Sequence, residues 1–310
     1  MTKLAQIKKK RTYKVVYLRP KQNKDMTTLI ADSGSTKTNW LLISNNGKIE
    51  KYQTEGINPV VGDSTLISNT IGKSFAPYVE GTKIDKIIFY GAGCTSSKKG
   101  VVEKALYKFF PDAEIEVESD VLAAARALCG HNEGIACIMG TGSNSCLFNG
   151  KQIIRNISPL GYILGDESSG AVLGKNLVGD ILKKQFSEEI CQNFFDETKL
   201  TEEEIIDRVY RKPMPNRFLA SFVPFIHRHH RDSQIGEFLV ANFRRFLQRN
   251  VLPYERPDLD VNFIGGVAHS FKEEIGVAMQ IENLKLGRIE LTPQDGLLAY
   301  HTATSNNIIF

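Results

Sequence analysis

The sequence predicts an α/β protein that is built from two similar halves. An apolar run at residues 27–32 is followed by two strand-like segments around Asn46-Gly47, a dipeptide that favours a hairpin turn. Strand-like and helix-like segments then alternate from 63 to 130, which is typical of an α/β layer. The pattern of strand, polar turn, strand, Asn-Gly turn and strand returns at 134–156, and such repetition indicates an internal duplication.

The order of the elements divides the chain into an extension and two domains. We expect helices near 63–78, 97–110 and 120–130 and strands at 86–93 and 113–119, followed by a largely helical stretch at 170–250. Residues 260–279 return to a strand, a glycine turn and a helix. We therefore predict a first domain at 26–120, with a C-terminal helix at 293–304 that packs back on it. The second domain is predicted at 121–292, with a helical insertion.

Composition and charge restrict the classes of partner. An apolar fraction of 42% with 24% charged residues is ordinary for a globular protein. Residues 1–25 carry nine Lys or Arg and one acidic residue, so the remaining 285 residues have a net charge of −4. An acidic body argues against nucleic-acid binding, and no apolar stretch approaches the length of a membrane span. We expect 1–25 to form a basic extension outside the packed fold, either flexible or not native.

The cysteines and histidines predict neither a metal centre nor disulfides. The five cysteines show no C-x-x-C spacing, so we interpret them as reduced thiols of a cytoplasmic protein. The run "HRHHR" at 227–231 has no acidic or cysteine partner at a suitable spacing. We interpret it as an exposed basic face of a helix rather than a metal site.

The first polar turn combines an acid with residues suited to phosphate. Its members are Asp32, Ser33, Gly34, Ser35, Thr36 and Lys37. A strand-to-strand bend rich in glycine and serine leaves backbone N–H groups free to bind an anion. The leading carboxylate can hold hydrated Mg²⁺. The P-loop pattern is absent, because this turn continues into a strand, and a plain polar hairpin turn is the alternative.

Two later turns have related chemistry. Gly140, Thr141, Gly142, Ser143 and Asn144 form a second polar bend, in which the glycines permit close approach of the backbone to a ligand. Gly265 and Gly266 separate a strand from a helix, where glycine lets an adenine or ribose lie against the backbone. For the third turn, a tight strand-to-helix connection explains the glycines equally well.

Together, the three turns resemble those of the ATPase superfamily shared by sugar kinases, actin and the large heat-shock chaperones. The likeness is closest to the N-acetylglucosamine kinase branch, which is related to the activators of benzoyl-CoA reductase and hydroxyglutaryl-CoA dehydratase, and it spans about 26–304. The resemblance implies two duplicated actin-like (ribonuclease H-like) ATPase domains around a central cleft. It places ATP phosphates at Ser33–Lys37 and Gly140–Gly142, adenosine at Gly265 and Gly266, and Mg²⁺ at Asp32.

The same resemblance assigns the residues that bind the sugar, which accepts the phosphate. Asp120 lies where a strand gives way to a helix, and helix capping is its ordinary role. The resemblance makes it the base that accepts a proton from a sugar hydroxyl. Asp166 and Glu167 match the family's G-D-E-G-S motif, although adjacent acids also occur at helix starts. The implied sugar ligands are Asn58, Ser143, Asn144, Asp166 and Glu167.

These features predict a kinase that transfers the γ-phosphate of ATP to the 6-hydroxyl of N-acetylglucosamine or a close amino sugar. Ser168 stands where glycine is usual, and Leu160 replaces a small or aromatic residue, so glucosamine and N-acetylmuramic acid stay open as substrates. An ATP-driven activator or switch protein is the alternative from another class, although its cluster-binding cysteines are not matched. A degenerate relative that binds sugar without turnover is a third. We expect ATP and a small amino sugar as partners, without nucleic acid or membrane, and leave a homodimer open.

Overall fold

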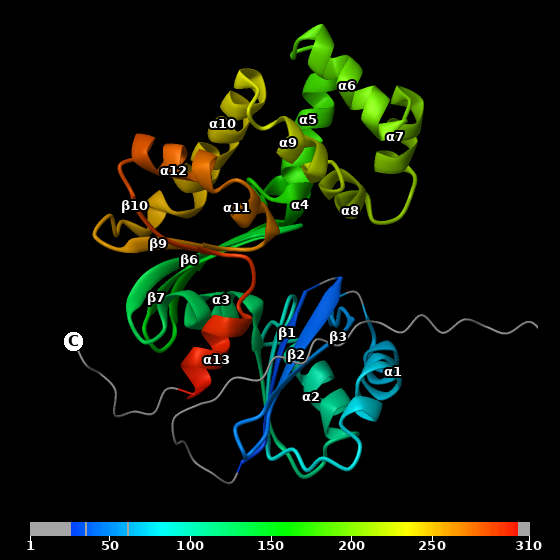
Figure 1. Ribbon diagram of the computed structural model, residues 1–310, viewed down its shortest axis with the longest axis vertical. Helices are drawn as coiled ribbons and strands as arrows, with labels where there is room; N and C mark the ends of the chain where they lie inside the picture. Colours follow the sequence, from blue (N-terminus) through cyan, green and yellow to red (C-terminus); the bar gives the residue numbers. More distant parts are fainter. Residues whose placement is uncertain (1–25, 35, 61, 303–310) are drawn as a thin grey trace, which may run out of the picture. The chain divides into compact units, whose positions relative to one another are not determined.

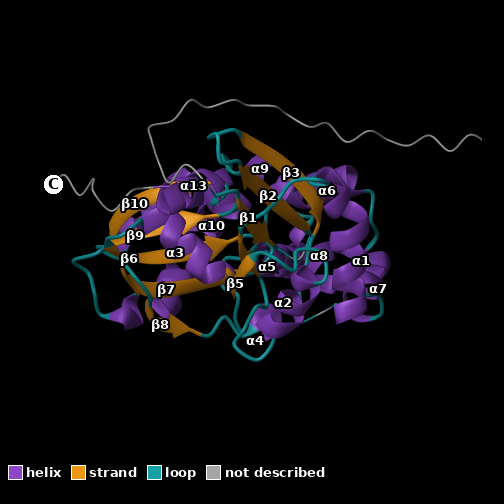
Figure 2. Cartoon of the chain, turned by 90° about the horizontal axis from the view of Figure 1, so that it is seen from below, coloured by secondary structure: helices purple, strands orange, loops and turns teal. Residues whose placement is uncertain are grey.

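The computed structural model describes residues 26–34, 36–60 and 62–302, which form two compact units (Figure 1; Figure 2). The first unit comprises the described residues up to Ala123 together with His301 and Thr302. The second runs from Ala124 to Tyr300. The predicted extension at 1–25, Ser35 and the last two residues of the predicted helix at 293–304 lie outside the described residues. Each unit is built on a mixed five-stranded sheet, so the predicted α/β class is confirmed.

The first sheet has the strand order β3-β2-β1-β4-β5. Its strands are β1 (Thr28–Ser33), β2 (Lys37–Ile43), β3 (Ile49–Glu55), β4 (Lys86–Gly91) and β5 (Glu114–Ser119). β2 is antiparallel to both β1 and β3, whereas β4 is parallel to β1 and β5 is parallel to β4. β1, β3, β4 and β5 therefore all run in one direction, and their carboxyl ends meet at one edge of the sheet.

Two helices cover one face of this sheet, α1 (Ser64–Ser74) and α2 (Lys99–Tyr107) (Figure 1). Trp40 lies in the core between these helices and the sheet, and its ring stacks on that of Phe75 with 4.0 Å between centroids. Such aromatic burial contributes strongly to stability because each ring removes a large apolar area from water. The helix α3 (Asp120–Cys129) follows β5 directly.

The second sheet repeats the connectivity of the first. Its order is β10-β9-β6-β7-β8, with strands β6 (Glu133–Met139), β7 (Ser143–Asn149), β8 (Ile153–Ile157), β9 (Asp260–Ile264) and β10 (Lys285–Glu290). When this order is reversed, each strand corresponds to one strand of the first sheet, with the same antiparallel hairpin and the same parallel pairs. The duplication that the sequence predicts is therefore confirmed.

The helical stretch of the second unit lies between β8 and β9 in sequence. It comprises α4 (Gly161–Leu164), α5 (Gly170–Leu182), α6 (Glu188–Thr198), α7 (Glu202–Tyr210), α8 (Pro215–Ala220), α9 (Val223–His229) and α10 (Ser233–Asn250). After β9 follow α11 (Gly266–Ser270), α12 (Lys272–Ile281) and finally α13 (Gln294–Thr302). Residues of α5, α10 and α12 pack with β6 and β9 into one apolar core. None of the described helices is both long and apolar enough to cross a bilayer.

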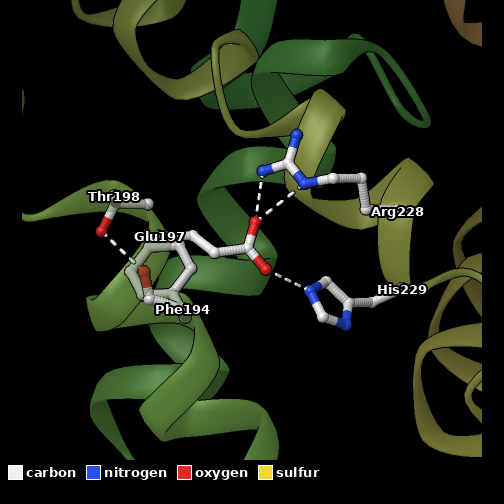
Figure 3. A network of polar contacts seen from close by, with 5 residues as sticks. All are labelled: Phe194, Glu197, Thr198, Arg228 and His229. Carbon is white, nitrogen blue, oxygen red and sulfur yellow. Dashed lines mark hydrogen bonds and ion pairs between the residues drawn. The ribbon is translucent and has the colours of Figure 1, made fainter.

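The histidine-rich run is only partly the exposed basic face that its sequence suggests. His229 contacts Glu197 of α6 through its Nε2 atom at 2.5 Å, and Arg228 donates to the same carboxylate (Figure 3). His230 bonds Glu274 of α12 at 2.7 Å. The acids that pair with this run come from distant helices, so local spacing could not reveal them. Among the described residues, no group of three or more His, Cys, Asp or Glu is arranged to hold a metal ion, and the five cysteines are free.

Candidate functional site

In the first unit, the predicted residues gather at the edge where the parallel strands end. Ser33 of β1 pairs in register with Gly91 of β4, which pairs with Ser119 of β5. Asp32 stands one residue before this line and Asp120 one residue after it. Two strand spacings separate β1 from β5, so their backbones lie about 10 Å apart. The sheet thus brings together two carboxylates that are 88 positions apart in the chain.

The first turn is closed by its own hydrogen bonds. The Gly34 N–H donates to the carbonyl of Lys37 at 3.0 Å. Ser33 is fully buried, and its hydroxyl both donates to the carbonyl of Ile57 and accepts from the Ile57 N–H, each at 2.9 Å. The Ser33 hydroxyl therefore ties the loop after β3 to the turn. Gly34, Thr36 and Lys37 are exposed.

The negative charge of Asp120 acts on Asp32. Burial, the largest cause, and the negative charge of Asp120 raise the pKa of Asp32 to about 6, while a hydrogen bond from Asn39 and the charge of Lys37 act against the rise. Burial also raises the pKa of Asp120. Two carboxylates that destabilise each other's charge favour a cation nearby. Mg²⁺ commonly takes one or two carboxylates together with substrate phosphates and water, so Asp32 fits such an ion.

The capping alternative for Asp120 is not what the structure has. The hydroxyl of Ser119 accepts a bond from the Leu122 N–H at 3.3 Å, which is the contact of an N-cap residue. Asp120 is the first helical residue, and its carboxylate accepts from the adjacent Val121 N–H at 2.9 Å and from its own backbone N–H. Because the neighbouring serine caps the helix, the Asp120 carboxylate retains acceptor positions for a ligand.

Asn58 reaches the same edge from the loop after β3. Its Oδ1 atom accepts from the Val60 N–H at 2.9 Å. A Cβ built on Gly93, which follows β4, would lie 2.4 Å from that oxygen. Asn58 therefore lies directly beside the loop after β4, in the unit that also holds Asp120.

In the second unit, the polar turn after β6 packs against the loop that precedes α5 and contains Asp166, Glu167 and Ser168, here called the acidic loop. The Ser143 hydroxyl donates to the carbonyl of Glu167 at 2.8 Å, and the Ser143 N–H bonds the Asp166 carboxylate. The N–H of Gly170 donates to the carbonyl of Gly140 at 2.7 Å. A Cβ on Gly142 would lie 3.3 Å from Oδ2 of Asp166. The turn and the acids, which are more than twenty residues apart in sequence, form one surface.

The two adjacent acids have different surroundings. Burial is the largest cause that raises the pKa of Asp166 to about 6. The hydrogen bond from the Ser143 N–H lowers this pKa, and the negative charge of Glu167 raises it. Glu167 is 7% exposed and its carboxylate is held by Arg249 and Asn250 of α10. Helix α5 begins only at Gly170, so the acids are not the first turn of a helix. The helix-start interpretation of this pair is therefore wrong.

The remaining predicted residues of this unit also lie near the end of β6. Asn144 is the second residue of β7, and its Oδ1 accepts from the Ser145 N–H and from Asn156, both at 2.9 Å. Gly265 has φ +122°, and a Cβ there would lie 2.3 Å from the carbonyl oxygen of Met139. The glycine turn after β9 is thus in direct contact with the beginning of the second polar turn, whereas Gly266 has open space at its Cβ position.

Sequence reasoning missed three residues that touch predicted ones. Asn39 bonds Asp32, and it stands opposite Asp32 on β2 because the hairpin pairs them directly. The Asn46-Gly47 turn sets the register of β2 with β3, in which Asn39 stands opposite Gln53. The pairing of Asn39 with Asp32 is set instead by the first polar turn, which joins β1 to β2. Arg249 and Asn250 come from the end of a helix about eighty residues after the acidic loop, and nothing local marks them.

Comparisons with known proteins identify the family of this chain. No protein-family model and no curated protein matches the chain. Among solved structures, it is similar to a protein of Porphyromonas gingivalis that carries the provisional name N-acetylglucosamine kinase. The two are 47% identical over 91% of this chain and 100% of that one, with a TM-score of 0.86. The chain belongs to the N-acetylglucosamine kinase family.

More distant structures share only the fold with this N-acetylglucosamine kinase family member. A provisional N-acetylglucosamine kinase of Chromobacterium violaceum is 17% identical over 89% of this chain and 99% of its own, with a TM-score of 0.69. The ethanolamine utilization protein EutJ of Carboxydothermus hydrogenoformans is 16% identical over 91% and 89%, with a TM-score of 0.51. The two sheets are those of duplicated actin-like ATPase domains.

Proposed function

We propose that this protein is an ATP-dependent kinase that phosphorylates the 6-hydroxyl of N-acetylglucosamine or a close amino sugar. One observation carries the proposal: Asp32 near the end of β1 and Asp120 directly after β5 lie at the same edge of one sheet, and the charge of Asp120 raises the pKa of Asp32. A phosphate-bound cation at Asp32 and an acceptor hydroxyl at Asp120 would both be favoured there. The family membership and the provisional names of the relatives support the same reaction class.

Asp120 is proposed as the residue that accepts the proton of the sugar hydroxyl. Its neighbour Ser119 caps the helix, so the carboxylate is available to orient the attacking oxygen and to take its proton. A pKa raised by burial brings a carboxyl group closer to the working pH, which improves a general base. Phosphoryl transfer depends mainly on such positioning and on stabilisation of charge.

The phosphates are proposed to bind the exposed part of the first turn and the glycine turn after β6. Gly34 lets a phosphate approach the backbone closely, Thr36 supplies a backbone N–H, and Lys37 supplies a positive charge. At the turn after β6, Gly140 and Gly142 allow close approach of the backbone to a ligand. Mg²⁺, held by Asp32 with phosphate and water oxygens, would neutralise charge on the transferring phosphate. The protein is proposed to act in the cytoplasm, where ATP is abundant.

The sugar is proposed to bind Asn58, Asn144 and Asp166. A carboxylate with a pKa near 6 is ionised at neutral pH and accepts hydrogen bonds from two hydroxyls in fixed directions. Asn144 would donate from its amide nitrogen, because its Oδ1 already accepts two bonds within the protein, and the Asn58 amide would add further polar contacts. Ser143 and Glu167, which the resemblance also assigns to the sugar, use their side chains on partners within the protein.

The test is ADP release from ATP and Mg²⁺ with a panel of N-acetylglucosamine, glucosamine and N-acetylmuramic acid. We expect sugar-dependent turnover that falls by about a hundredfold or more in Asp120→Asn, the scale of a lost general base. Asp112→Asn, which changes an exposed acid of the same unit, is the matched control. Equal turnover in Asp120→Asn and the wild type would remove Asp120 from the mechanism, and no turnover with any sugar would contradict the proposed function.

A further inference from the structure

The acidic loop has a strained backbone in the region that the proposed function assigns to the sugar. Asp166 has φ +50° and Ser168 has φ +58°, and neither is glycine. Residues with side chains rarely occupy this left-handed region, and they persist in it only where surrounding contacts fix them. The departure of Ser168 from the family's glycine therefore needs a structural support.

Helix α10 supplies that support at two points. The Ser168 hydroxyl, which is 1% exposed, donates to the carbonyl of Asn242 at 2.8 Å. At the end of the helix, Asn250 donates from Nδ2 to Oε2 of Glu167 at 3.1 Å, and Arg249 donates from Nε to Oε1 at 2.5 Å. Glu167 and Ser168 are consecutive in the loop, and they are bound to Asn250 and Asn242, which lie eight positions apart on α10.

Asn250 also connects this loop to the second polar turn. It is 5% exposed, and its carbonyl accepts from the hydroxyl of Ser145 on β7 at 2.7 Å. Ser143 lies two residues before Ser145 on the same strand. Its hydroxyl donates to the Glu167 carbonyl, and its backbone N–H bonds the Asp166 carboxylate. Asn250 therefore holds the acidic loop with its side chain and strand β7 with its backbone carbonyl, and Ser143 of the same strand bonds the Asp166 carboxylate.

We propose that Asn250, together with Arg249, is a positioning residue for sugar binding, which fixes the Asp166 carboxylate by holding Glu167. This inference rests on the proposed function and deepens it. Glu167 becomes the support of a sugar ligand. A buried carboxylate needs paired donors for both of its oxygens, and Asn250 and Arg249 supply one each. A ligand displaced by about 1 Å loses much of its effect on a bound substrate.

The test separates sugar affinity from nucleotide use. In Asn250→Ala and in Arg249→Ala, we expect the KM for the best amino sugar to rise by about tenfold to a hundredfold, the range found when supports of a ligand are removed. In Arg249→Ala, the KM for ATP is expected to stay within about twofold, because the Arg249 side chain pairs with Glu167 and not with a proposed phosphate ligand. The sugar-induced rise in Tm of each variant, measured at one fixed sugar concentration, should fall in parallel.

Two further variants of α10 control for charge and for folding. Arg245→Ala removes the same charge from an exposed position of the same helix and should leave the sugar KM unchanged. Arg249→Lys keeps a positive charge and should recover part of the loss. The Arg249 side chain is 51% exposed, so its variants fold even if Asn250→Ala does not.

Three outcomes would overturn the inference. The first is a wild-type sugar KM in Arg249→Ala, and the second is an equal rise in the KM values for sugar and ATP, which would indicate general loosening. The third is an Arg245→Ala variant that loses sugar affinity as much as Arg249→Ala does. A wild-type protein that neither turns over nor binds any amino sugar would instead refute the proposed function, and this inference with it.

Discussion

Replacement of Gly265 by alanine tests how the glycine turn after β9 shapes the predicted phosphate turn. At φ +122° and ψ +168°, the Gly265 backbone occupies a region that is almost restricted to glycine. An added Cβ would lie 2.3 Å from the carbonyl oxygen of Met139, 2.8 Å from its carbonyl carbon and 3.3 Å from the nitrogen of Gly140. All three atoms are backbone, so no side chain can move aside.

The expected cost follows from these contacts. The unfavourable backbone conformation costs about 1–3 kcal/mol for a residue with a side chain. Overpacking against a fixed neighbour costs about 1–3 kcal/mol more, so we expect Gly265→Ala to lower the free energy of unfolding by about 4 kcal/mol. Relief of the clash requires the Met139 carbonyl to move by about 1 Å, a displacement that can cost about a hundredfold in catalysis.

The matched control is Gly266→Ala, since a Cβ there meets nothing within 4 Å and its φ is not positive. Urea unfolding should show a loss of about 4 kcal/mol for Gly265→Ala and a change of less than about 1 kcal/mol for Gly266→Ala. Gly266 is itself a predicted adenosine contact, so this control applies to stability alone. Equal stabilities of the two variants would refute the close contact between the glycine turn and Met139.

Two further predictions concern Asp32 and the second polar turn. Since the fold raises the pKa of Asp32 from 3.8 to about 6, the native state binds the extra proton between these values, and the contribution of Asp32 to stability falls as pH rises through them. Asp32→Asn should therefore gain stability relative to wild type between pH 4 and pH 8, by up to about 3 kcal/mol, whereas a pH-independent difference in urea unfolding would exclude this. In Gly142→Ala, the added Cβ would press on Asp166 of the acidic loop, whereas in Gly140→Ala the Cβ would meet open space. Gly142→Ala should therefore raise the KM for sugar more than Gly140→Ala does. The reverse order in steady-state kinetics would count against the packing of the turn on the loop.

The elements of this fold were predictable because their signals are local. The Asn46-Gly47 turn, the alternation of strands and helices and the repeated pattern at 134–156 match β1 to β8 and α3 closely. A hairpin turn or an apolar periodicity depends on residues a few positions apart. The polar turns were recognisable for the same reason, because glycine, serine and acids stand next to one another in the chain.

The partners of the site residues were not predictable in the same way. The chain has Ser119 and Asp120 side by side, and both are good capping residues, so only the folded helix decided that Ser119 takes the cap. The pairing of Glu167 with Asn250 depends on where α10 ends against the second sheet. Such contacts follow from strand order and helix packing, which a local pattern does not encode.

The sequence by itself determined the duplicated α/β plan, the polar turns and the residues from which a kinase site is proposed, because backbone propensities and turn chemistry act over a few residues. Only the tertiary structure decided which of those side chains are used internally and which are left for ligands. Ser33 and Ser143 are the clearest cases, since their hydroxyls bond segments 24 positions away. The physical reason is that a buried polar group must find a partner, and the fold alone sets which partner is within reach.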